Sequence, residues 1–439
     1  MPENYDAIII GAGVIGAAIG YEMAKKGQKT INIDMGPEAG YGSTAASCAI
    51  IRVHYSTFDG CAIAWEGYHY WKKWEDYLGV ADESGLAKFI ECGAMVYKTE
   101  VNGYLEKVMA NAAALNIPFD ELDAAAIEAK LPIAQTASVG PPKAMDDPDF
   151  DKKGDPVRGA VYFPTAGYIT DPKLSAHNLQ RAAEAHGATF RYRTKIVEIL
   201  VEDGKTAGVK LEDGSEVRAP VVVNVAGPHS FKVNRMAKLQ DGSTVEDHCN
   251  IKTQALKVEV SHVPPPPGFN YEKDAFVTSD SDIGCYTRPE HGNHILIGSE
   301  DPECDPRIFV DPDDWDDSFS DQWKAQVYRL GLRYPDLPVT PPVKGVVSLY
   351  DAADDWIPIY DKSDLPGFYM AIGTSGNQYK NAPVAGALMA ELIEKVQAGH
   401  DHDKDPVQFD LKHIGKTISL GFYSRNREIN TESSMSVIG

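Results

Sequence analysis

The segment Gly11-Ala12-Gly13-Val14-Ile15-Gly16 decides the fold of this chain. It follows a short β-rich run at residues 6–10 and opens a helical pattern, residues 13–26, whose apolar side chains share one face. A second strand-like run follows at residues 30–34. The order of strand, glycine turn, helix and strand predicts a βαβ unit at the start of the chain.

Glycines at these three positions suit a dinucleotide phosphate. Gly11 permits a tight turn, Gly13 lets the backbone approach a pyrophosphate, and Gly16 lets the helix pack closely on the strand. The helix N-terminus then faces the phosphate charge. Asp34 ends the second strand, where its carboxylate can accept hydrogen bonds from ribose hydroxyls. The residues expected to contact such a cofactor here are Gly11, Gly13, Val14, Ile15, Gly16 and Asp34. The motif alone does not distinguish NAD from FAD.

Length and composition narrow the class of protein. A chain of 439 residues, 43% hydrophobic and 24% charged, is long enough for two or three globular domains. Its formal net charge of −22 would repel a phosphate backbone, so we expect no nucleic acid partner. The six cysteines contain no C-x-x-C pair, which favours reduced thiols and predicts neither a disulfide framework nor a metal site.

The N-terminal region carries no targeting pattern. The first apolar run, residues 7–10, has only the length of a strand, and no basic region precedes it. It predicts neither a signal peptide nor a membrane span. The acidic balance is typical of a solvated surface that aids solubility, and we expect a cytoplasmic protein.

Two later stretches repeat the α/β character, and strand-rich or alanine-rich segments separate them. The expected elements are a helix at residues 174–186, strands at 190–199, 221–225 and 367–372, and a helix at 383–397. We therefore predict an α/β plus α+β protein. Residues 1–84, 151–230 and 346–439 form a Rossmann-like cofactor domain, and residues 85–150 and 231–345 form an inserted substrate domain with an antiparallel sheet.

Further motifs follow in order along the chain. They are Gly42-Ser43-Thr44-Ala45-Ala46-Ser47 with Ile50-Ile51-Arg52, Asn224-Val225-Ala226-Gly227-Pro228-His229-Ser230, Cys285-Tyr286-Thr287-Arg288-Pro289-Glu290 with Ile295-Leu296-Ile297-Gly298, Tyr350-Asp351, Pro358-Ile359 and Gly376-x-x-Tyr379-Lys380. Together they resemble the sarcosine oxidase and D-amino acid oxidase superfamily, above all the sarcosine oxidase-like enzymes and sarcosine oxidase β-subunits, from residue 6 to about residue 395. The superfamily is FAD-dependent, so the resemblance implies that FAD is the cofactor.

The resemblance also implies which residues hold the flavin. Val197 contacts the adenine portion through its backbone. The helix at residues 383–397 begins beneath the flavin pyrimidine, where its N-terminus stabilises negative charge on the reduced ring. The other cofactor contacts implied in this way are Ser43, Thr44, Ala45, Ile51, Ala226, Gly227, Gly376, Asn377, Gln378 and Lys380.

By the same resemblance, Arg52 and Lys380 hold a substrate carboxylate and leave the reacting carbon over the flavin. A planar guanidinium suits a bidentate carboxylate contact, although isolated cations are usually surface ion-pair residues. Tyr350 matches an active-site tyrosine that orients the substrate. An equally good interpretation is that Tyr350 is a core aromatic residue whose hydroxyl is hydrogen-bonded. His54 and Tyr55 follow Arg52 closely. A lone histidine there is more often structural than a base.

Two features depart from the superfamily. Ser348 and Ala45 stand where many members tether the flavin to a cysteine or a histidine, so we expect non-covalent FAD, with Cys48 and Cys285 as the nearest thiols. Leu296 stands where oxidase members carry a lysine that helps dioxygen accept an electron. Without that charge, a dehydrogenase is favoured over an oxidase.

These residues predict an FAD-dependent amine or amino acid dehydrogenase. It would oxidise the C–N bond of a small carboxylate-bearing secondary or N-methylated amine to an imine, which water hydrolyses. Two alternatives stay open: a flavin-dependent 2-hydroxy acid dehydrogenase, and the flavin subunit of a larger amine dehydrogenase complex. The sequence names neither the substrate nor the electron acceptor, and homo-oligomerisation also stays open.

Overall fold

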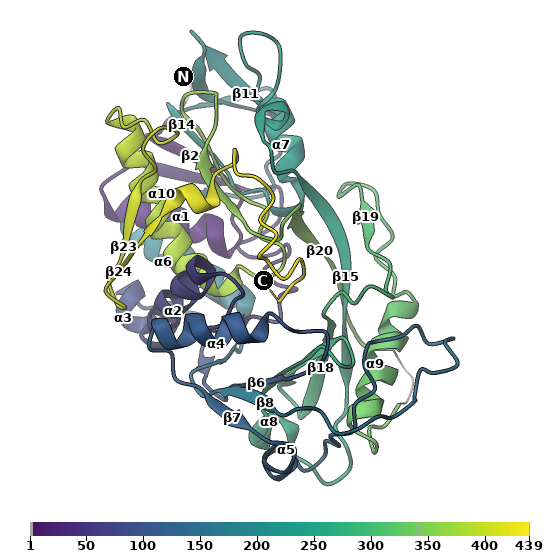
Figure 1. The fold of residues 1–439 in the computed structure, drawn as a ribbon. Helices are drawn as coiled ribbons and strands as arrows, with labels where there is room; N and C mark the ends of the chain where they lie inside the picture. The colour runs from purple at the N-terminus through teal and green to yellow at the C-terminus, as the bar shows by residue number, and fades with distance from the viewer. Residues whose placement is uncertain (1–2, 340–342, 439) are drawn as a thin grey trace.

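The computed structural model describes residues 3–339 and 343–438, so residues 1–2 and 439, the ends of the predicted cofactor domain, lie outside it. Two large sheets lie in the two halves of an elongated molecule (Figure 1). One is mainly parallel and carries helices, and the other is mainly antiparallel. This arrangement confirms the predicted α/β plus α+β fold.

The parallel sheet is built from segments far apart in the sequence. Its strands, in spatial order, are β10 (Thr189–Arg191), β3 (Thr30–Ile33), β2 (Ala7–Ile10), β14 (Val221–Asn224), β22 (Phe368–Ile372) and β21 (Ile359–Lys362). Only β21 runs antiparallel to its neighbour. Helix α1 (Val14–Lys25) packs against both α6 (Pro172–Ala185) and α10 (Ala382–Gln397). The central strands are fully buried, as their unbroken apolar runs predict.

The strand predicted at residues 190–199 is wrong as a single element. The chain forms β10 and then a separate strand, β11 (Ile196–Glu202). Arg193 takes a left-handed φ of +52°, which breaks the extended backbone between them. A small four-stranded sheet results, with the order β1 (Glu3–Asn4), β13 (Glu216–Arg218), β12 (Lys205–Leu211) and β11.

The second large sheet has nine strands and only one parallel pair, β6 with β16. Its order is β19 (Ile308–Val310), β15 (Thr253–Val263), β18 (His294–Ser299), β17 (Cys285–Glu290), β16 (Val277–Asp280), β6 (Ala94–Tyr97), β8 (Ala160–Phe163) and β7 (Asp120–Leu122), with β20 (Gly345–Ala353) also pairing with β15. Helix α9 (Asp321–Arg333) packs against β15 and β18. The predicted domain boundaries stay a prediction. Strand β8 and all of β20 except Gly345 lie in this sheet although those boundaries place them in the cofactor domain.

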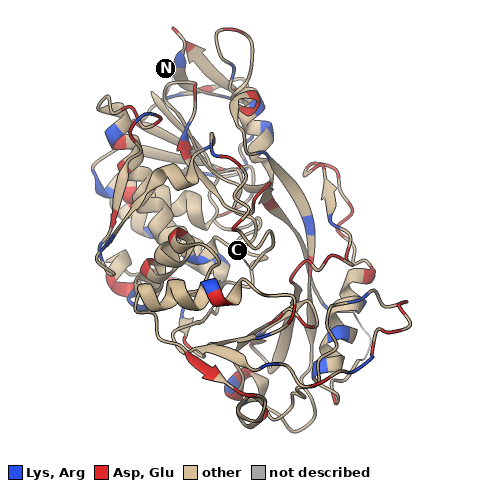
Figure 2. Ribbon diagram, in the orientation of Figure 1, with Lys and Arg blue, Asp and Glu red and all other residues tan. Residues whose placement is uncertain are grey.

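The remaining elements surround the two sheets. The helices are α2 (Phe58–Lys72), α3 (Trp74–Leu78), α4 (Leu105–Ala114), α5 (Ala124–Lys130), α7 (Ser230–Met236) and α8 (Tyr271–Asp274), with 3₁₀ turns η1 (Gly227–His229), η2 (Val245–His248), η3 (Tyr379–Asn381) and η4 (Leu420–Tyr423). The small strands are β4 (Ile50–Ile51), β9 (Gly167–Ile169) and β5 (Phe89–Ile90) in one sheet, and β23 (Gln408–Leu411) with β24 (Lys416–Ser419) in another. Acidic side chains occur over both halves of the molecule rather than on one face (Figure 2).

Candidate functional site

The glycine turn between β2 and α1 has no room for side chains. Gly11 has a φ of +118°, and a Cβ there would lie 2.4 Å from the backbone oxygen of Val225. A Cβ on Gly16 would lie 2.4 Å from the backbone oxygen of Gly11. The turn therefore needs glycine for its own packing, and it leaves a bare backbone at the start of α1.

The start of α1 is suited to hold a pyrophosphate. Gly13 has no side chain with which to cap the first N–H groups of the helix, so those of Ile15 and Gly16 stay available to a ligand. Thr44 Oγ1 accepts a hydrogen bond from the Val14 N–H at 3.0 Å, which brings the second flavin motif to the same helix end. These residues fit the dinucleotide that the motif predicts.

Asp34 lies beside this turn with its carboxylate fixed. One carboxylate oxygen accepts a hydrogen bond from the Ala12 N–H and the other accepts one from the Gly36 N–H, each at 2.7 Å. Each oxygen has further acceptor capacity, because an ionised carboxylate accepts about four hydrogen bonds. The position agrees with a carboxylate that binds ribose hydroxyls.

The second flavin motif and Val197 are held by backbone contacts. Ser43 donates to the Leu349 backbone oxygen at 2.8 Å, Ala45 donates its N–H to the Gly40 oxygen at 2.8 Å, and Ile51 is fully buried in β4. Val197 lies in β11, where the register with β12 shifts between Ile196 and Glu198. A backbone contact to adenine remains a prediction for this residue.

The ends of β14 and β22 supply the other predicted contacts. Ala226 donates its N–H to the Asn224 side chain at 3.2 Å, and Gly227 has a φ of +56°. The Asp351 carboxylate accepts from the Gly373 N–H at 2.6 Å, and the Asp351 backbone oxygen accepts from the Ser375 N–H at 2.8 Å. Asp351 therefore holds the turn that leads into η3 and α10.

Tyr350 lies against this turn. Gly376 has a φ of +67°, and a Cβ there would lie 2.3 Å from the Tyr350 ring. The side chains of the next two residues are bonded within the protein: Asn377 Nδ2 donates to the Trp356 backbone oxygen at 3.3 Å, and Gln378 Nε2 donates to Asn377 Oδ1 at 2.6 Å. The structure thus brings Tyr350 and the predicted flavin turn into contact.

The two predicted cations meet at Tyr55. The Arg52 guanidinium stacks over the Tyr55 ring, 4.1 Å from its centroid, and Lys380 Nζ donates to the Tyr55 hydroxyl at 2.9 Å. Both cations are buried, with 8% of Arg52 and 3% of Lys380 exposed, so they are not surface ion-pair residues. Lys380 also donates to the Asn377 backbone oxygen at 2.7 Å.

The charge states of this group follow from burial. Burial, and to a smaller extent the charge of Arg52, hold the pKa of Lys380 well below its usual range. Burial, then Arg52 and Lys380, lower the pKa of His54 in the same way. Burial and the neighbouring cations therefore favour the neutral forms of Lys380 and His54, whereas the Arg52 guanidinium stays charged.

A model of the family described as FAD dependent oxidoreductase matches residues 6–392. The chain belongs to this family. Its cofactor is therefore FAD, as the glycine turn, the helix end and Asp34 indicate.

Relatives within the FAD-dependent oxidoreductases match nearly the whole chain. Glycine oxidase of Geobacillus kaustophilus is 23% identical over 95% of this chain and 99% of its own length. Sarcosine oxidase subunit beta of Rhodobacter capsulatus is 24% identical over 90% of this chain and 86% of its own. The resemblance to sarcosine oxidase-like proteins is thereby confirmed.

Solved structures share the fold. L-proline dehydrogenase from P. horikoshii superposes with a TM-score of 0.74 at 18% identity, over 97% of this chain and 98% of its own. Glycine oxidase from Geobacillus kaustophilus superposes with a TM-score of 0.72 at 20% identity, over 98% of this chain and 100% of its own. These likenesses extend across both large sheets, because they cover almost every residue.

The thiols near the flavin motifs are poor candidates for a covalent link. Cys48 Sγ lies 3.4 Å from the Tyr286 hydroxyl, and burial raises the pKa of this thiol. Burial raises the pKa of Cys285 well above its usual value as well. A protonated thiol is a weak nucleophile, so both residues fit the expectation of non-covalent FAD.

The position of the missing oxidase lysine is apolar and buried. Leu296 is 3% exposed in β18, directly opposite Arg288 in β17. Arg288 is a buried cation next to this position, and its guanidinium donates to the Glu290 carboxylate at 2.7 Å. The Glu290 carboxylate compensates the positive charge of Arg288. Arg288 is therefore a weaker electrostatic substitute than an unpaired lysine would be at this position.

Besides Tyr55, four residues of the site were not predicted as functional. His54 stacks on Phe163, with 4.5 Å between ring centroids, and neither ring nitrogen has a hydrogen-bond partner among the described residues. The Tyr104 hydroxyl and one oxygen of Asp301 are buried and also lack a partner there. Val437 contacts Arg52 through its backbone. Only His54 has a sequence signal, its closeness to Arg52.

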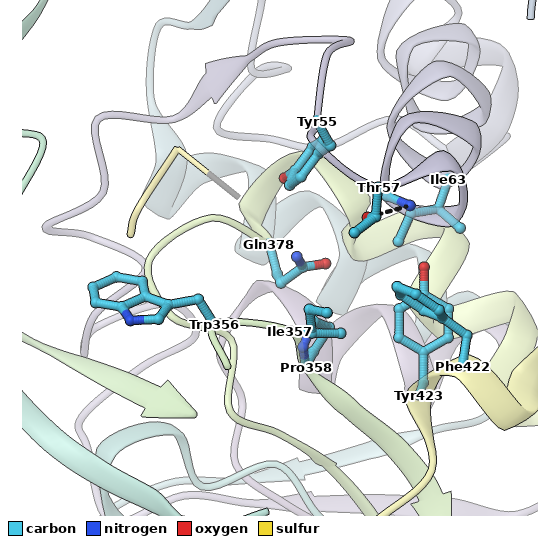
Figure 3. A pocket seen from close by; sticks show the side chains of 10 residues that line it. Tyr55, Thr57, Ile63, Trp356, Ile357, Pro358, Gln378, Phe422 and Tyr423 are labelled. Carbon is cyan, nitrogen blue, oxygen red and sulfur yellow. Dashed lines mark hydrogen bonds between the residues drawn. The ribbon is translucent and has the colours of Figure 1, made fainter. Parts of the chain in front are cut away.

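A small cavity of about 10 Å³ lies beside the site (Figure 3). Its walls include Tyr55, Gln378 and Trp356, together with apolar and aromatic groups such as Ile357 and Tyr423. That volume holds about one water molecule, so this cavity is too small for an amino acid.

Two further findings concern a metal and a membrane. Asp82, Glu83 and His177 bring ligand atoms within 4.8 Å of one another, but the Asp82 carboxylate already accepts hydrogen bonds from His177 and Asn178. This group therefore gives no separate indication of a metal. Over residues 3–339 and 343–438, no helix has the length and apolar character needed to cross a bilayer.

Proposed function

We propose that this FAD-dependent oxidoreductase is a dehydrogenase of a small amino acid with a secondary or N-methylated amine. The observation that carries the proposal is the buried group of Arg52, Tyr55 and Lys380 beside the flavin turn. A buried guanidinium without a carboxylate partner among the described residues needs an anion, and a substrate carboxylate supplies one. The names of the relatives, glycine oxidase and sarcosine oxidase subunit beta, support an amino acid substrate.

The residues of the chain place the substrate and handle its proton. Arg52 binds the carboxylate, and Tyr350 limits the position of the reacting carbon. Burial lowers the pKa of Lys380, and a carboxylate that arrives beside it raises the affinity of Nζ for a proton. Lys380 can therefore take a proton from the substrate ammonium, which must be neutral before its C–N bond is oxidised. Buried Tyr55 and Trp356 help to exclude water.

FAD held at the glycine turn and Asp34 would supply the acceptor for the hydride that leaves the substrate carbon. The amine becomes an imine, and water converts the imine to a carbonyl compound and an amine. The electrons pass to an acceptor other than dioxygen, a proposal supported by apolar Leu296 and by the pairing of Arg288 with Glu290.

A second candidate is the flavin subunit of a multi-subunit amine dehydrogenase. The similarity to sarcosine oxidase subunit beta over 90% of this chain favours it. The chemistry at the flavin would be the same, and only the route of the electrons would differ. Copurification of smaller subunits with the tagged chain from its own cells would identify this case.

The test is an anaerobic screen of the FAD-loaded protein with amino acids, N-methylamino acids and 2-hydroxy acids. Loss of the flavin absorbance with amino or N-methylamino acids is the expected result. Bleaching by 2-hydroxy acids alone would contradict the amine proposal, because the same carboxylate clamp also suits a hydroxy acid. Bleaching by none of these compounds would contradict the carboxylate clamp itself.

A further inference from the structure

The segment from Asn430 to Ile438 lies across the candidate substrate site. In Figure 1 the yellow end of the chain runs to the middle of the molecule and reaches the region of β20. Arg307 donates to the Met435 backbone oxygen at 2.7 Å, and Lys107 pairs with Glu432 at 3.3 Å. The segment is therefore held by side chains from two distant parts of the sequence.

Val437 makes the central contact of this segment. Its backbone oxygen accepts a hydrogen bond from Arg52 Nη2 at 3.0 Å. Its side chain packs in the same apolar cluster as Trp356 and Tyr350. Its backbone N–H is close enough to the carboxyl group of Asp301, in the loop after β18, to lower the pKa of that group. A single residue thus joins the predicted carboxylate-binding arginine to a buried carboxyl group.

Asp301 is unusual in its surroundings. It has a left-handed φ of +55°, a strained conformation for a residue other than glycine, and its N–H donates to Ser299 Oγ at 3.0 Å. Its Oδ2 is buried and has no hydrogen-bond partner among the described residues. The charged groups that act on it are Arg307 and Asp305. A buried carboxyl oxygen without a partner is unfavourable unless a ligand supplies a donor.

We propose that Asp301 binds the amino group of an α-amino acid whose carboxylate lies on Arg52, and that Val437 occupies this place in the unliganded protein. The inference rests on the proposed function. The N–H and C=O groups of one residue are attached to the same carbon, as the amino and carboxylate groups of an α-amino acid are. In a β- or γ-amino acid, extra carbons separate the two groups. The span between Asp301 and Arg52 therefore selects α-amino acids, and the ligand must displace Val437.

The test compares the FAD-loaded wild-type protein with Asp301→Asn. Asparagine keeps the shape of aspartate and tolerates a positive φ, but it has no charge for an ammonium group. Glu303→Gln is the matched control, because Glu303 is exposed and only two residues away. FAD content and the thermal midpoint report whether each variant folds. Acetate, followed by its perturbation of flavin absorbance, probes the carboxylate position without an amine.

We expect Asp301→Asn to raise the half-saturating concentration of the best α-amino acid by about 10- to 100-fold. The affinity for acetate should stay the same, and Glu303→Gln should change neither value. Equal half-saturation in wild type and Asp301→Asn, or bleaching by a γ-amino acid as efficient as by its α-isomer, would overturn the inference while leaving the proposed function intact. If no amino acid bleaches the wild-type flavin, the proposed function fails, and the inference fails with it.

Discussion

The amino group of Lys380 and the hydroxyl of Tyr55 lie 2.9 Å apart in the buried centre of the candidate site. Burial and Arg52 lower the pKa of Lys380, which favours the neutral amine while no anion is bound. A carboxylate that binds without bringing a proton of its own must then charge Lys380 from the solvent.

Acetate binding should therefore take up about one proton per site near neutral pH. An amino acid carries an ammonium proton into the site, so its binding should take up fewer protons from the solvent. The measurement uses FAD-loaded protein in weak buffer with a pH-indicator dye. Lys380→Met should abolish the acetate signal. Acetate that binds wild type with no change in the dye would show that Lys380 is already charged.

Arg52→Ala should raise the half-saturating substrate concentration by about 10²-fold or more, because a charged hydrogen bond contributes about 2–3 kcal/mol. FAD content should stay normal, since Arg52 contacts Tyr55, His54 and Val437 rather than the glycine turn. Arg158→Ala is a suitable control, because the Arg158 side chain is 70% exposed. Unchanged steady-state kinetics in Arg52→Ala would remove this residue from the substrate site.

Acid precipitation should release the yellow flavin into the supernatant. Ser348 and Ala45 stand at the usual tethering positions, and burial keeps the Cys48 and Cys285 thiols protonated. Intact-mass measurement of the acid-treated chain gives the second readout. A mass increase of one FAD would identify a covalent link, and Cys48→Ser and Cys285→Ser would then locate it.

Leu296→Lys should speed the reaction of the reduced protein with air. The wild-type protein should reoxidise slowly in aerated buffer and pass electrons readily to an artificial dye, because Arg288 is paired with Glu290. Leu296→Met is the uncharged control. Stopped-flow recovery of flavin absorbance measures both rates. Fast reoxidation of the wild type, with stoichiometric peroxide, would contradict the dehydrogenase proposal.

Glu300→Gln should make the protein more stable at neutral and alkaline pH. Burial raises the pKa of Glu300 from 4.5 to about 7, so the folded protein holds a proton that the unfolded chain releases. The contribution of Glu300 to the free energy of unfolding is therefore largest below about pH 4.5. It falls as the pH rises to about 7, by about 3 kcal/mol at most.

The thermal midpoint at several pH values measures this effect. Asp301 and Asp351 also have raised pKa values, about 6 and about 7, and shift the stability in the same direction. The quantity to follow with pH is therefore the difference in thermal midpoint between wild type and Glu300→Gln. Glu303→Gln is the exposed control. A difference that does not change with pH would show that Glu300 does not titrate in this range.

The local sequence predicts those parts of the site in which neighbouring residues alone determine which side chain fits. Gly11 and Gly16 are required because the backbone approaches too closely for a Cβ, and this requirement appears as a motif. The contact between Arg52 and Val437 joins residues 385 positions apart and follows no local pattern. The lowered pKa of Lys380 depends on burial, which only the folded chain establishes. The sequence pattern predicts one strand across Arg193, because residues other than glycine seldom adopt the positive φ that separates β10 from β11 there.

The strand order of the parallel sheet has a consequence for synthesis of the protein. Strand β2, which ends at Ile10, is synthesised long before its neighbour β14, which ends at Asn224, and before β22, which covers the next edge and ends at Ile372. The cofactor site therefore cannot be completed while most of the chain is still being translated. FAD binding therefore requires translation of β22, and a chain that stops before β22 exposes the apolar edge of β14 to other chains.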